Sequence, residues 1–176
     1  MEFQKLIETR RTVRKYAADS KVTREQMEAL IRAAQEAPSW KNSQTGRYYC
    51  VLSREIVDKI RATCLPGAGN AGKSENAALI VTTFVHDRAG FQKDGTADNE
   101  LGNGWGCYDL GLQNENLILK AADLGLSTLI MGLRESDKLR ELLDIPETET
   151  VIAVGKAAES PARPPRKELD AIAKFF

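Results

Sequence analysis

Three arginines and a hydroxyl group stand close together near the start of the chain, in the run Arg10, Arg11, Thr12, Val13, Arg14. A guanidinium group stays charged at any working pH and binds phosphate through two parallel hydrogen bonds. The run therefore predicts an anion clamp, in which Arg10, Arg11 and Thr12 contact a phosphate. Taken alone, an arginine-rich run has a simpler explanation, which is a solvated charged surface.

A second polar segment follows later in the chain and carries side-chain amides and hydroxyls behind a proline. It consists of Pro38, Ser39, Trp40, Lys41, Asn42, Ser43 and Gln44. Such groups donate and accept hydrogen bonds, so they suit the heteroatom edge of a planar ligand. A phosphate at one end and a polar ring at the other describe a mononucleotide cofactor.

In their order and spacing, these two motifs resemble those of the nitroreductase family of FMN-dependent oxidoreductases. The resemblance covers nearly the whole chain and implies a single FMN-binding domain over residues 1–176. It implies an α+β fold with a mixed central β-sheet flanked by helices, a long buried helix and an extended C-terminal tail. It also implies a homodimer with FMN at the subunit interface, and NADH or NADPH as the electron donor.

The resemblance assigns three further positions to the flavin ring. Arg14 would lie beside the N1–C2=O edge, where reduced flavin gains negative charge, and a nearby cation stabilises such a charge. Asn70 and Lys73 would contact the same pyrimidine edge, although their segment read alone favours a plain surface turn. Backbone N–H groups at Met131 and Gly132 would face N5 and O4, and a glycine lets the backbone approach closely.

A basic stretch near the C-terminus is a further phosphate-binding candidate. The resemblance implies that Arg166 and Lys167 close on the same phosphate as the clamp. Their spacing differs from that of the family, which favours Arg166 over Lys167, and Arg163 is a third candidate.

The polar segment would contact the cofactor that the other subunit mainly binds, through Pro38, Ser39, Trp40, Asn42 and Gln44. Many members of the family have a smaller residue in place of the tryptophan. A tryptophan there either shapes the acceptor pocket, by narrowing it or stacking on an aromatic substrate, or packs at the dimer contact. The short chain has no room for the larger helical insertion of the family, so we expect an open pocket and a loosely specified acceptor.

The function that the resemblance implies is hydride transfer from NAD(P)H to flavin N5, followed by reduction of a small aromatic, quinone or nitro acceptor in ping-pong fashion. This chemistry takes place on FMN and requires no side-chain acid, base or nucleophile, so no catalytic residue is predicted. Two alternatives stay open: an atypical flavin enzyme that degrades flavin or dehalogenates, and a flavin-binding protein without enzymatic activity.

The composition excludes several other classes of function. The chain has 25 basic and 25 acidic residues, so its charge does not favour nucleic acid or a membrane as partner. The three cysteines, in no C-x-x-C spacing, argue against a disulfide framework and indicate a reducing cytoplasm. A single histidine makes a His/Cys metal site improbable. No G-x-G-x-x-G motif follows a strand, which disfavours a dinucleotide-binding Rossmann fold.

The hydrophobic periodicity predicts helices alternating with strands, typical of an α+β or mixed α/β sandwich. Helices are expected over 3–9 and 105–124, from the capping-box residue Thr23 to Pro38, after a cap at Ser53, and from a cap at Ser136 to Pro146. Strands are expected over 48–52, 79–85, 127–131 and 150–155, and loops over 66–70 and 87–104. The longer loop lines or covers the active site, or is a plain surface insertion. The tail 160–167 is expected to be extended and to lead into a short amphipathic helix.

Overall fold

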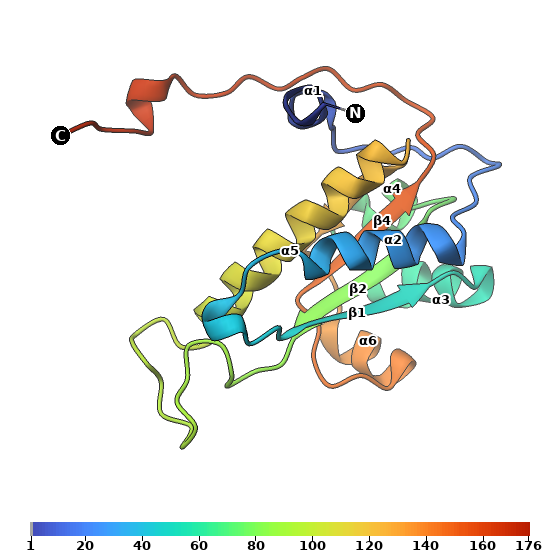
Figure 1. Ribbon diagram of the computed structural model, residues 1–176. Helices are drawn as coiled ribbons and strands as arrows, with labels where there is room; N and C mark the ends of the chain where they lie inside the picture. The colour runs from blue at the N-terminus through green and yellow to red at the C-terminus, as the bar shows by residue number, and fades with distance from the viewer. Residues whose placement is uncertain (1) are drawn as a thin grey trace.

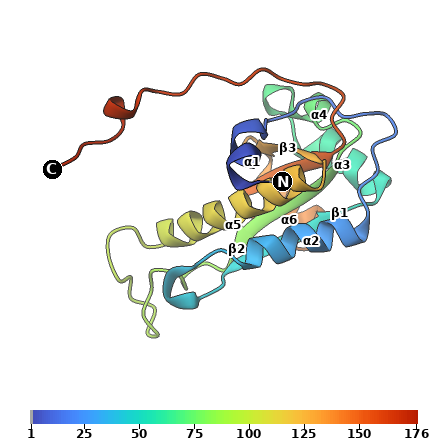
Figure 2. The ribbon, with the colours of Figure 1, turned by 45° about the horizontal axis from the view of Figure 1, so that its top comes forward.

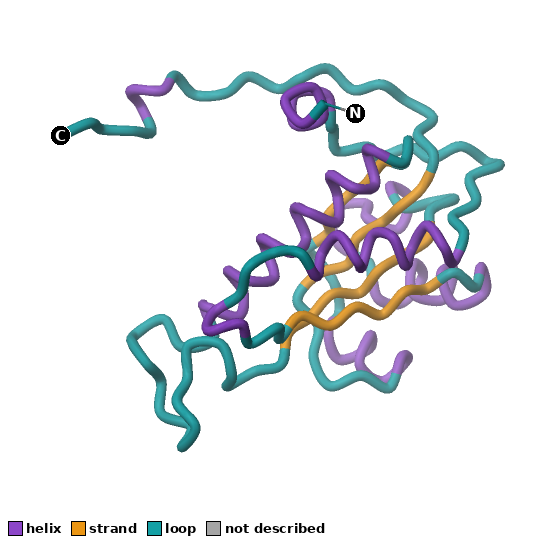
Figure 3. Tube along the Cα trace, viewed as in Figure 1, coloured by secondary structure: helices purple, strands orange, loops and turns teal. Residues whose placement is uncertain are grey.

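The centre of the molecule is an antiparallel β-sheet. A computed structural model describes residues 2–176, except for the side chain at position 68, and within them four strands pair in the order β1-β2-β4-β3. The strands are β1 (Gly46–Val51), β2 (Ala78–Phe84), β3 (Ser127–Met131) and β4 (Thr150–Gly155). Apolar, β-branched sequences over β2 and β4 place both strands inside the sheet, where nearly every residue is buried. The predicted α+β architecture is confirmed (Figure 3), but these four strands pair antiparallel throughout, where a mixed sheet was expected.

Helices cover both faces of this sheet. They are α1 (Phe3–Thr9), α2 (Arg24–Gln35), α3 (Arg54–Cys64), α4 (Asn70–Lys73), α5 (Gly104–Asp123) and α6 (Ser136–Leu143). Three short 3₁₀ turns are η1 (Trp40–Asn42), η2 (Gly67–Gly69) and η3 (Leu169–Ala171). Helices α2 and α5 lie on one face, and α3 and α6 lie on the other (Figures 1 and 2). Each face therefore has its own apolar layer, one around Leu79 and Val81 and the other around Ile80 and Ile152.

The long buried helix is α5, and it begins and ends one residue before the predicted limits. Leu110, Leu117 and Ile118 are buried along it, as the periodicity predicts. Its Gly106 lies against the ring of Phe84, where an added Cβ would come within 2.3 Å of two ring atoms. The missing side chain therefore sets how closely α5 approaches β2.

Local signals placed some helix boundaries correctly and others wrongly. The capping box at Thr23 is confirmed, since its hydroxyl accepts from the Gln26 backbone at 3.2 Å and the Gln26 side chain accepts in return at 2.9 Å. Helix α2 ends at Gln35, before the expected stop at Pro38. Ser53 occupies the N-cap position of α3, but its side chain makes no capping hydrogen bond.

The expected cap at Ser136 is also wrong, because Glu135 is the N-cap and Ser136 is the first residue of α6. The Ser136 hydroxyl instead shares a 2.7 Å hydrogen bond with the hydroxyl of Thr148. A partner distant in sequence has replaced the local capping contact.

Two segments outside the sheet differ from their predictions. The expected loop over 66–70 contains η2 and the start of α4, and Asn70 is buried there, unlike a residue of a plain surface turn. After β4 the chain runs along the outside of the molecule, past α1, and leaves the body as an extended tail (Figure 1). That tail ends in the 3₁₀ turn η3, where a short amphipathic helix was expected.

No helix within residues 2–176 is long and apolar enough to cross a membrane.

Candidate functional site

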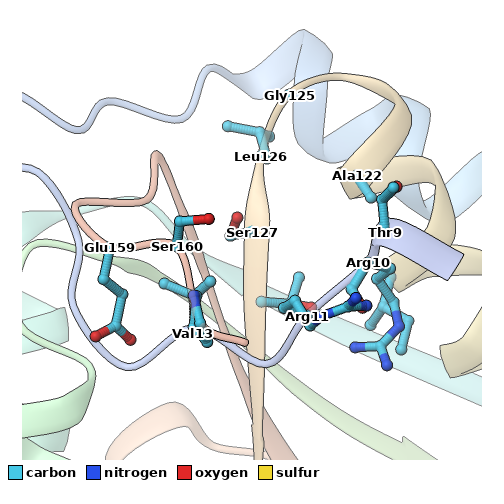
Figure 4. Close-up of a pocket in the computed structure, with 13 residues that line it drawn as sticks. Thr9, Arg10, Arg11, Val13, Ala122, Gly125, Leu126, Ser127, Glu159 and Ser160 are labelled. Carbon is cyan, nitrogen blue, oxygen red and sulfur yellow. The ribbon is translucent and has the colours of Figure 1, made fainter. Parts of the chain in front are cut away.

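A small cavity of about 220 Å³ lies beside the arginine run, between the end of α5, the start of β3 and the first residues of the tail. Arg10 and Arg11 line it from one side, and Ser127 and Ser160 bring hydroxyl groups to it (Figure 4). Two guanidinium groups and two hydroxyls form a set of hydrogen-bond donors that suits a phosphate. The structure thus brings together distant residues at the predicted clamp.

The two arginines are held differently. Arg11 donates from Nη1 to the carbonyl oxygens of Glu8 and Arg10, both at 2.7 Å, and so satisfies backbone groups at the end of α1. The Arg10 side chain forms no hydrogen bond or ion pair with any residue that the structure describes. Thr12 is fixed by a parallel bridge to Thr128 of β3. Arg10 is therefore the guanidinium group most available to an anion.

One carboxylate also borders this cavity. Glu159 lines it, and its Oε1 accepts a 2.6 Å hydrogen bond from the backbone N–H of Arg14. Figure 4 shows this carboxylate turned away from the side chains of Arg10 and Arg11. Glu159 thereby ties the tail to the arginine run, and the negative charge stays on the far side of the cavity from the arginines. The sequence carried no signal for this contact, which spans most of the chain.

A larger cavity of about 530 Å³ lies farther along the same segment, where Arg14 and Lys73 line it with Tyr16, Gly69 and Gly72. The Arg14 side chain makes no hydrogen bond or ion pair within residues 2–176. The Tyr16 hydroxyl donates inward, toward the carbonyl oxygens of Val13 and Ala153. Burial raises the pKa of Tyr16 and the nearby Glu159 raises it further, so the hydroxyl keeps its proton. Arg14 and Lys73, two of the three residues predicted at the pyrimidine edge, thus share one cavity, which the third, Asn70, does not line.

Helix α4, which borders this second cavity, is joined to the segment that follows β3. The Asn70 side chain donates to the carbonyl oxygen of Leu133 at 3.0 Å, which ties α4 to the residues after β3. Met131 is buried in the core, so only its backbone is available to a ligand, and Gly132 is exposed. Ile130 and Leu133 are 48% and 60% exposed, which leaves an open apolar surface at this end of β3.

The polar segment lies elsewhere in the same chain. The turn η1 contacts the N-terminal part of α5, where the Trp40 backbone N–H donates to Asp109 at 2.8 Å. The arginine cavity lies at the other end of α5, beside Ile118 and Ala122. From position 109 to position 122, α5 rises by roughly 20 Å. One chain does not bring its own clamp and turn together (Figure 1).

The backbone of this turn is strained. Lys41, Asn42 and Gln44 have positive φ angles of 47°, 54° and 48°, a region that residues with a Cβ rarely adopt. The Ser39 hydroxyl accepts from the Gln44 backbone at 3.0 Å, and the Gln44 side chain donates to Asn42 Oδ1 at 3.1 Å. Such strain persists only where surrounding contacts hold it, and it gathers at functional sites.

Sequence reasoning missed the residue that anchors the turn. Asp109 is 3% exposed and accepts the Trp40 N–H. Burial raises the pKa of Asp109, and the hydrogen bond from Trp40 opposes this rise. The rings of Trp40 and Trp105 lie in contact, tilted by 40° with 4.3 Å between their centroids, which adds a second attachment to α5. The sequence did hold a signal for Asp109, because a charged residue on the buried face of the predicted helix over 105–124 needs a partner.

The family model described as "Nitroreductase family" matches residues 7–156, which is most of the chain. This chain belongs to the nitroreductase family. A relative from Archaeoglobus fulgidus is 30% identical over 162 residues, which cover 87% of this chain and 82% of the relative. A relative from Methanothermobacter thermautotrophicus is 28% identical over 170 residues, covering 92% and 80%. Both are provisionally named NADH dehydrogenase/NAD(P)H nitroreductase.

Solved structures share the nitroreductase fold. A nitroreductase family protein from Streptococcus pneumoniae matches with a TM-score of 0.83 at 20% identity, covering 99% of this chain and 100% of that one. A provisionally named nitroreductase from Exiguobacterium sibiricum, in complex with FMN, matches with a TM-score of 0.78 at 22% identity, covering 100% and 98%. The fold is therefore that of the nitroreductase family over the full chain.

The basic residues of the tail do not reach the clamp of this nitroreductase chain. Arg163, Arg166 and Lys167 are exposed, and the Arg166 guanidinium donates to the carbonyl oxygens of Pro164 and Pro165. Among the described residues that line the arginine cavity, the tail contributes only Glu159, Ser160 and Pro161. The role of the three basic residues at the phosphate stays a prediction.

Proposed function

We propose that this chain is an FMN-dependent oxidoreductase that takes hydride from NADH or NADPH and reduces a small aromatic, quinone or nitro acceptor by a ping-pong mechanism. The observation that carries the proposal is the placement of Arg10 and Arg14. Each guanidinium group lies at a cavity, neither has a partner in the described chain, and one short extended segment joins them.

The residues at the two cavities fit FMN. The smaller cavity offers Arg10, Arg11 and two serine hydroxyls to a phosphate, and the larger one offers Arg14 and Lys73 to an electron-rich ring edge. From position 10 to position 14, an extended chain spans at most about 14 Å. A ribityl chain along this segment would join the phosphate to the ring.

FMN, when bound, supplies hydride and electron transfer, and the protein supplies binding, orientation and charge. Arg10 and Arg11 neutralise the phosphate and so hold the cofactor in register. Arg14 and Lys73 place positive charge where the reduced ring carries negative charge. The backbone at Met131 and Gly132, at the exposed end of β3, orients the ring without a side chain in the way.

We further propose that each site is completed by the turn of a second subunit. The turn's hydrogen-bonding groups lie roughly 20 Å from the clamp of their own chain along α5. The tail supports a dimer, since Leu169, Ile172 and Phe175 are 63%, 67% and 85% exposed in the single chain. A homodimer with a twofold axis would use each turn in the other subunit's site, in two equivalent copies.

The proposal is tested by visible spectroscopy of the purified protein under anaerobic conditions, before and after NADH and then NADPH. We expect a flavin band that bleaches with either donor and returns when an acceptor such as a quinone is added. A flavin band that persists would instead indicate a flavin-binding protein or an atypical flavin enzyme. If reconstitution with FMN leaves no band, the cofactor assignment is wrong.

A further inference from the structure

A separate cavity of about 400 Å³ lies beside the polar turn, where β1 begins and β2 ends. Two aromatic rings, of Trp40 and Phe91, form part of its wall. Three cations, Lys41, Arg47 and Arg88, form another part, and none of the described residues that line it is acidic. This cavity lies outside the clamp and the Arg14 cavity described above.

The positive charge at this cavity is only partly neutralised. Lys41 pairs with Asp98 at 2.9 Å. Arg47 donates from Nη1 alone, to backbone carbonyl oxygens of the turn, which do not cancel its charge. Arg88 is exposed, and its guanidinium group makes no hydrogen bond or ion pair with a residue in the described part of the chain. The nearby Asp87 accepts a hydrogen bond from the Asn103 side chain at 2.9 Å, which leaves its negative charge in place, so Asp87 offsets one of the two arginines. A net positive charge is therefore left for a ligand.

Three residues of the wall also carry a buried polar atom that has no hydrogen-bond partner among the described residues. These atoms are Trp40 Nε1, Ser43 Oγ and Thr45 Oγ1. Leaving a buried polar group unpaired costs about 1–3 kcal/mol. The two hydroxyls donate and rotate about a single bond, so they can turn toward an acceptor. Unpartnered hydroxyls that can rotate, beside the charges of Arg47 and Arg88, suit a ligand rich in acceptor oxygens.

We propose that this cavity binds the carboxylate or phosphate of a ring-bearing substrate, with the ring against Trp40 and Phe91 and the anionic oxygens on Arg88 and Arg47. Planar guanidinium groups bind both anions bidentately, and aromatic walls hold a flat ring. That the ligand is a substrate rests on the proposed function, which places this turn at the other subunit's cofactor. The anion comes from one of two sources, a carboxylated aromatic acceptor or the phosphates of a nicotinamide dinucleotide.

Tryptophan fluorescence gives a direct test of binding in the purified protein. The chain has two tryptophans: Trp40 lines the cavity, and the ring of Trp105 contacts the ring of Trp40. Titration with benzoate, phenyl phosphate and benzamide compares two anions with a neutral ring. We expect the anions to bind at least about tenfold more tightly than benzamide, which corresponds to about 1.4 kcal/mol. Equal affinity for benzoate and benzamide would overturn the proposal.

Substitution of Arg88 tests whether its charge is responsible for the preference for anions. Arg88→Gln should lose most of the preference for anions, and Arg88→Lys should keep part of it. Lys59→Gln removes an equal charge from the exposed side of α3 and should change nothing. A preference that survives in Arg88→Gln would contradict the assignment of the anion to this residue.

Steady-state kinetics then separates the two sources of the anion. If an acceptor binds here, Arg88→Gln raises KM for 4-nitrobenzoate and leaves KM for 4-nitrobenzamide and for NADH unchanged. If the dinucleotide binds here, KM for NADH rises with both acceptors. If Arg88→Gln changes none of these KM values, the anion that binds in the cavity is not a substrate, and the substrate part of the proposal is wrong. Failure of flavin reduction would refute the proposed function, while the fluorescence result would still decide whether the cavity binds anions.

Discussion

The separation of clamp and turn along α5 predicts that a cofactor site needs two chains, and mixed dimers test this. Arg10→Ala removes a guanidinium group that has no other partner, and the loss of one charged hydrogen bond weakens FMN binding by on the order of 2 kcal/mol. Asn42→Gly removes the amide of the turn, and glycine adopts the native φ of 54° without strain. Each variant should retain FMN poorly when it is alone.

Mixing the two variants should restore binding. Random exchange makes about half of the dimers mixed, and by the twofold symmetry one of their two sites combines an unaltered clamp with an unaltered turn. Retained FMN should therefore rise from near zero to about one quarter of the wild-type amount. A mixture of wild type and the double variant should fall, from about one half to about one quarter, since exchange separates intact pairs.

The assay measures flavin per subunit after gel filtration, at intervals during exchange, with a tagged partner to report that exchange has occurred. The two mixtures should converge from opposite directions. If exchange is complete and the first mixture stays near zero while the second stays near one half, each site lies within one chain. The arrangement proposed for the dimer would then be wrong.

Two other substitutions test contacts that the fold depends on. Gly106→Ala forces a Cβ to within 2.3 Å of the Phe84 ring and should lower the free energy of unfolding by about 1–3 kcal/mol. The control, Gly111→Ala, meets no atom within 4 Å and should not lower the free energy of unfolding. Equal urea midpoints for the two variants would refute the close contact between Gly106 and Phe84. Because burial raises the pKa of Asp109, the folded state holds that proton more tightly than the unfolded chain does, and stability is lost as pH rises through the folded pKa. Asp109→Asn still offers Trp40 an acceptor, so its urea midpoint at neutral pH should match or exceed that of the wild type. The difference should vanish below the unfolded pKa of about 4. A clearly lower midpoint for the variant at neutral pH would show that the fold needs the charge of Asp109.

Elements with strong periodicity could be predicted because their signals are local. Strands β3 and β4 match their predicted limits, and α5 differs by one residue at each end. The capping box at Thr23 also follows from residues within one turn. These features depend on neighbours a few positions apart, so the surrounding fold did not alter them.

Errors arose where a side chain had a distant partner. Ser136 looks like a helix cap, but its hydroxyl pairs with Thr148 across the fold. Asn70 looks like a residue of a surface turn, but it is buried and donates to Leu133. Propensity describes a residue before its tertiary contacts form, and those contacts then decide which hydrogen bond it makes.

Residue types and spacing in the arginine run and the polar turn were enough to indicate the family, a phosphate and a polar ring. The anion-binding chemistry of Arg10 and Arg14 follows from the guanidinium group itself, in any fold. Where the two motifs lie is a different matter. Because α5 is a rigid rod with the clamp at one end and Asp109 holding the turn at the other, only the packing of that helix shows that a single chain keeps them apart.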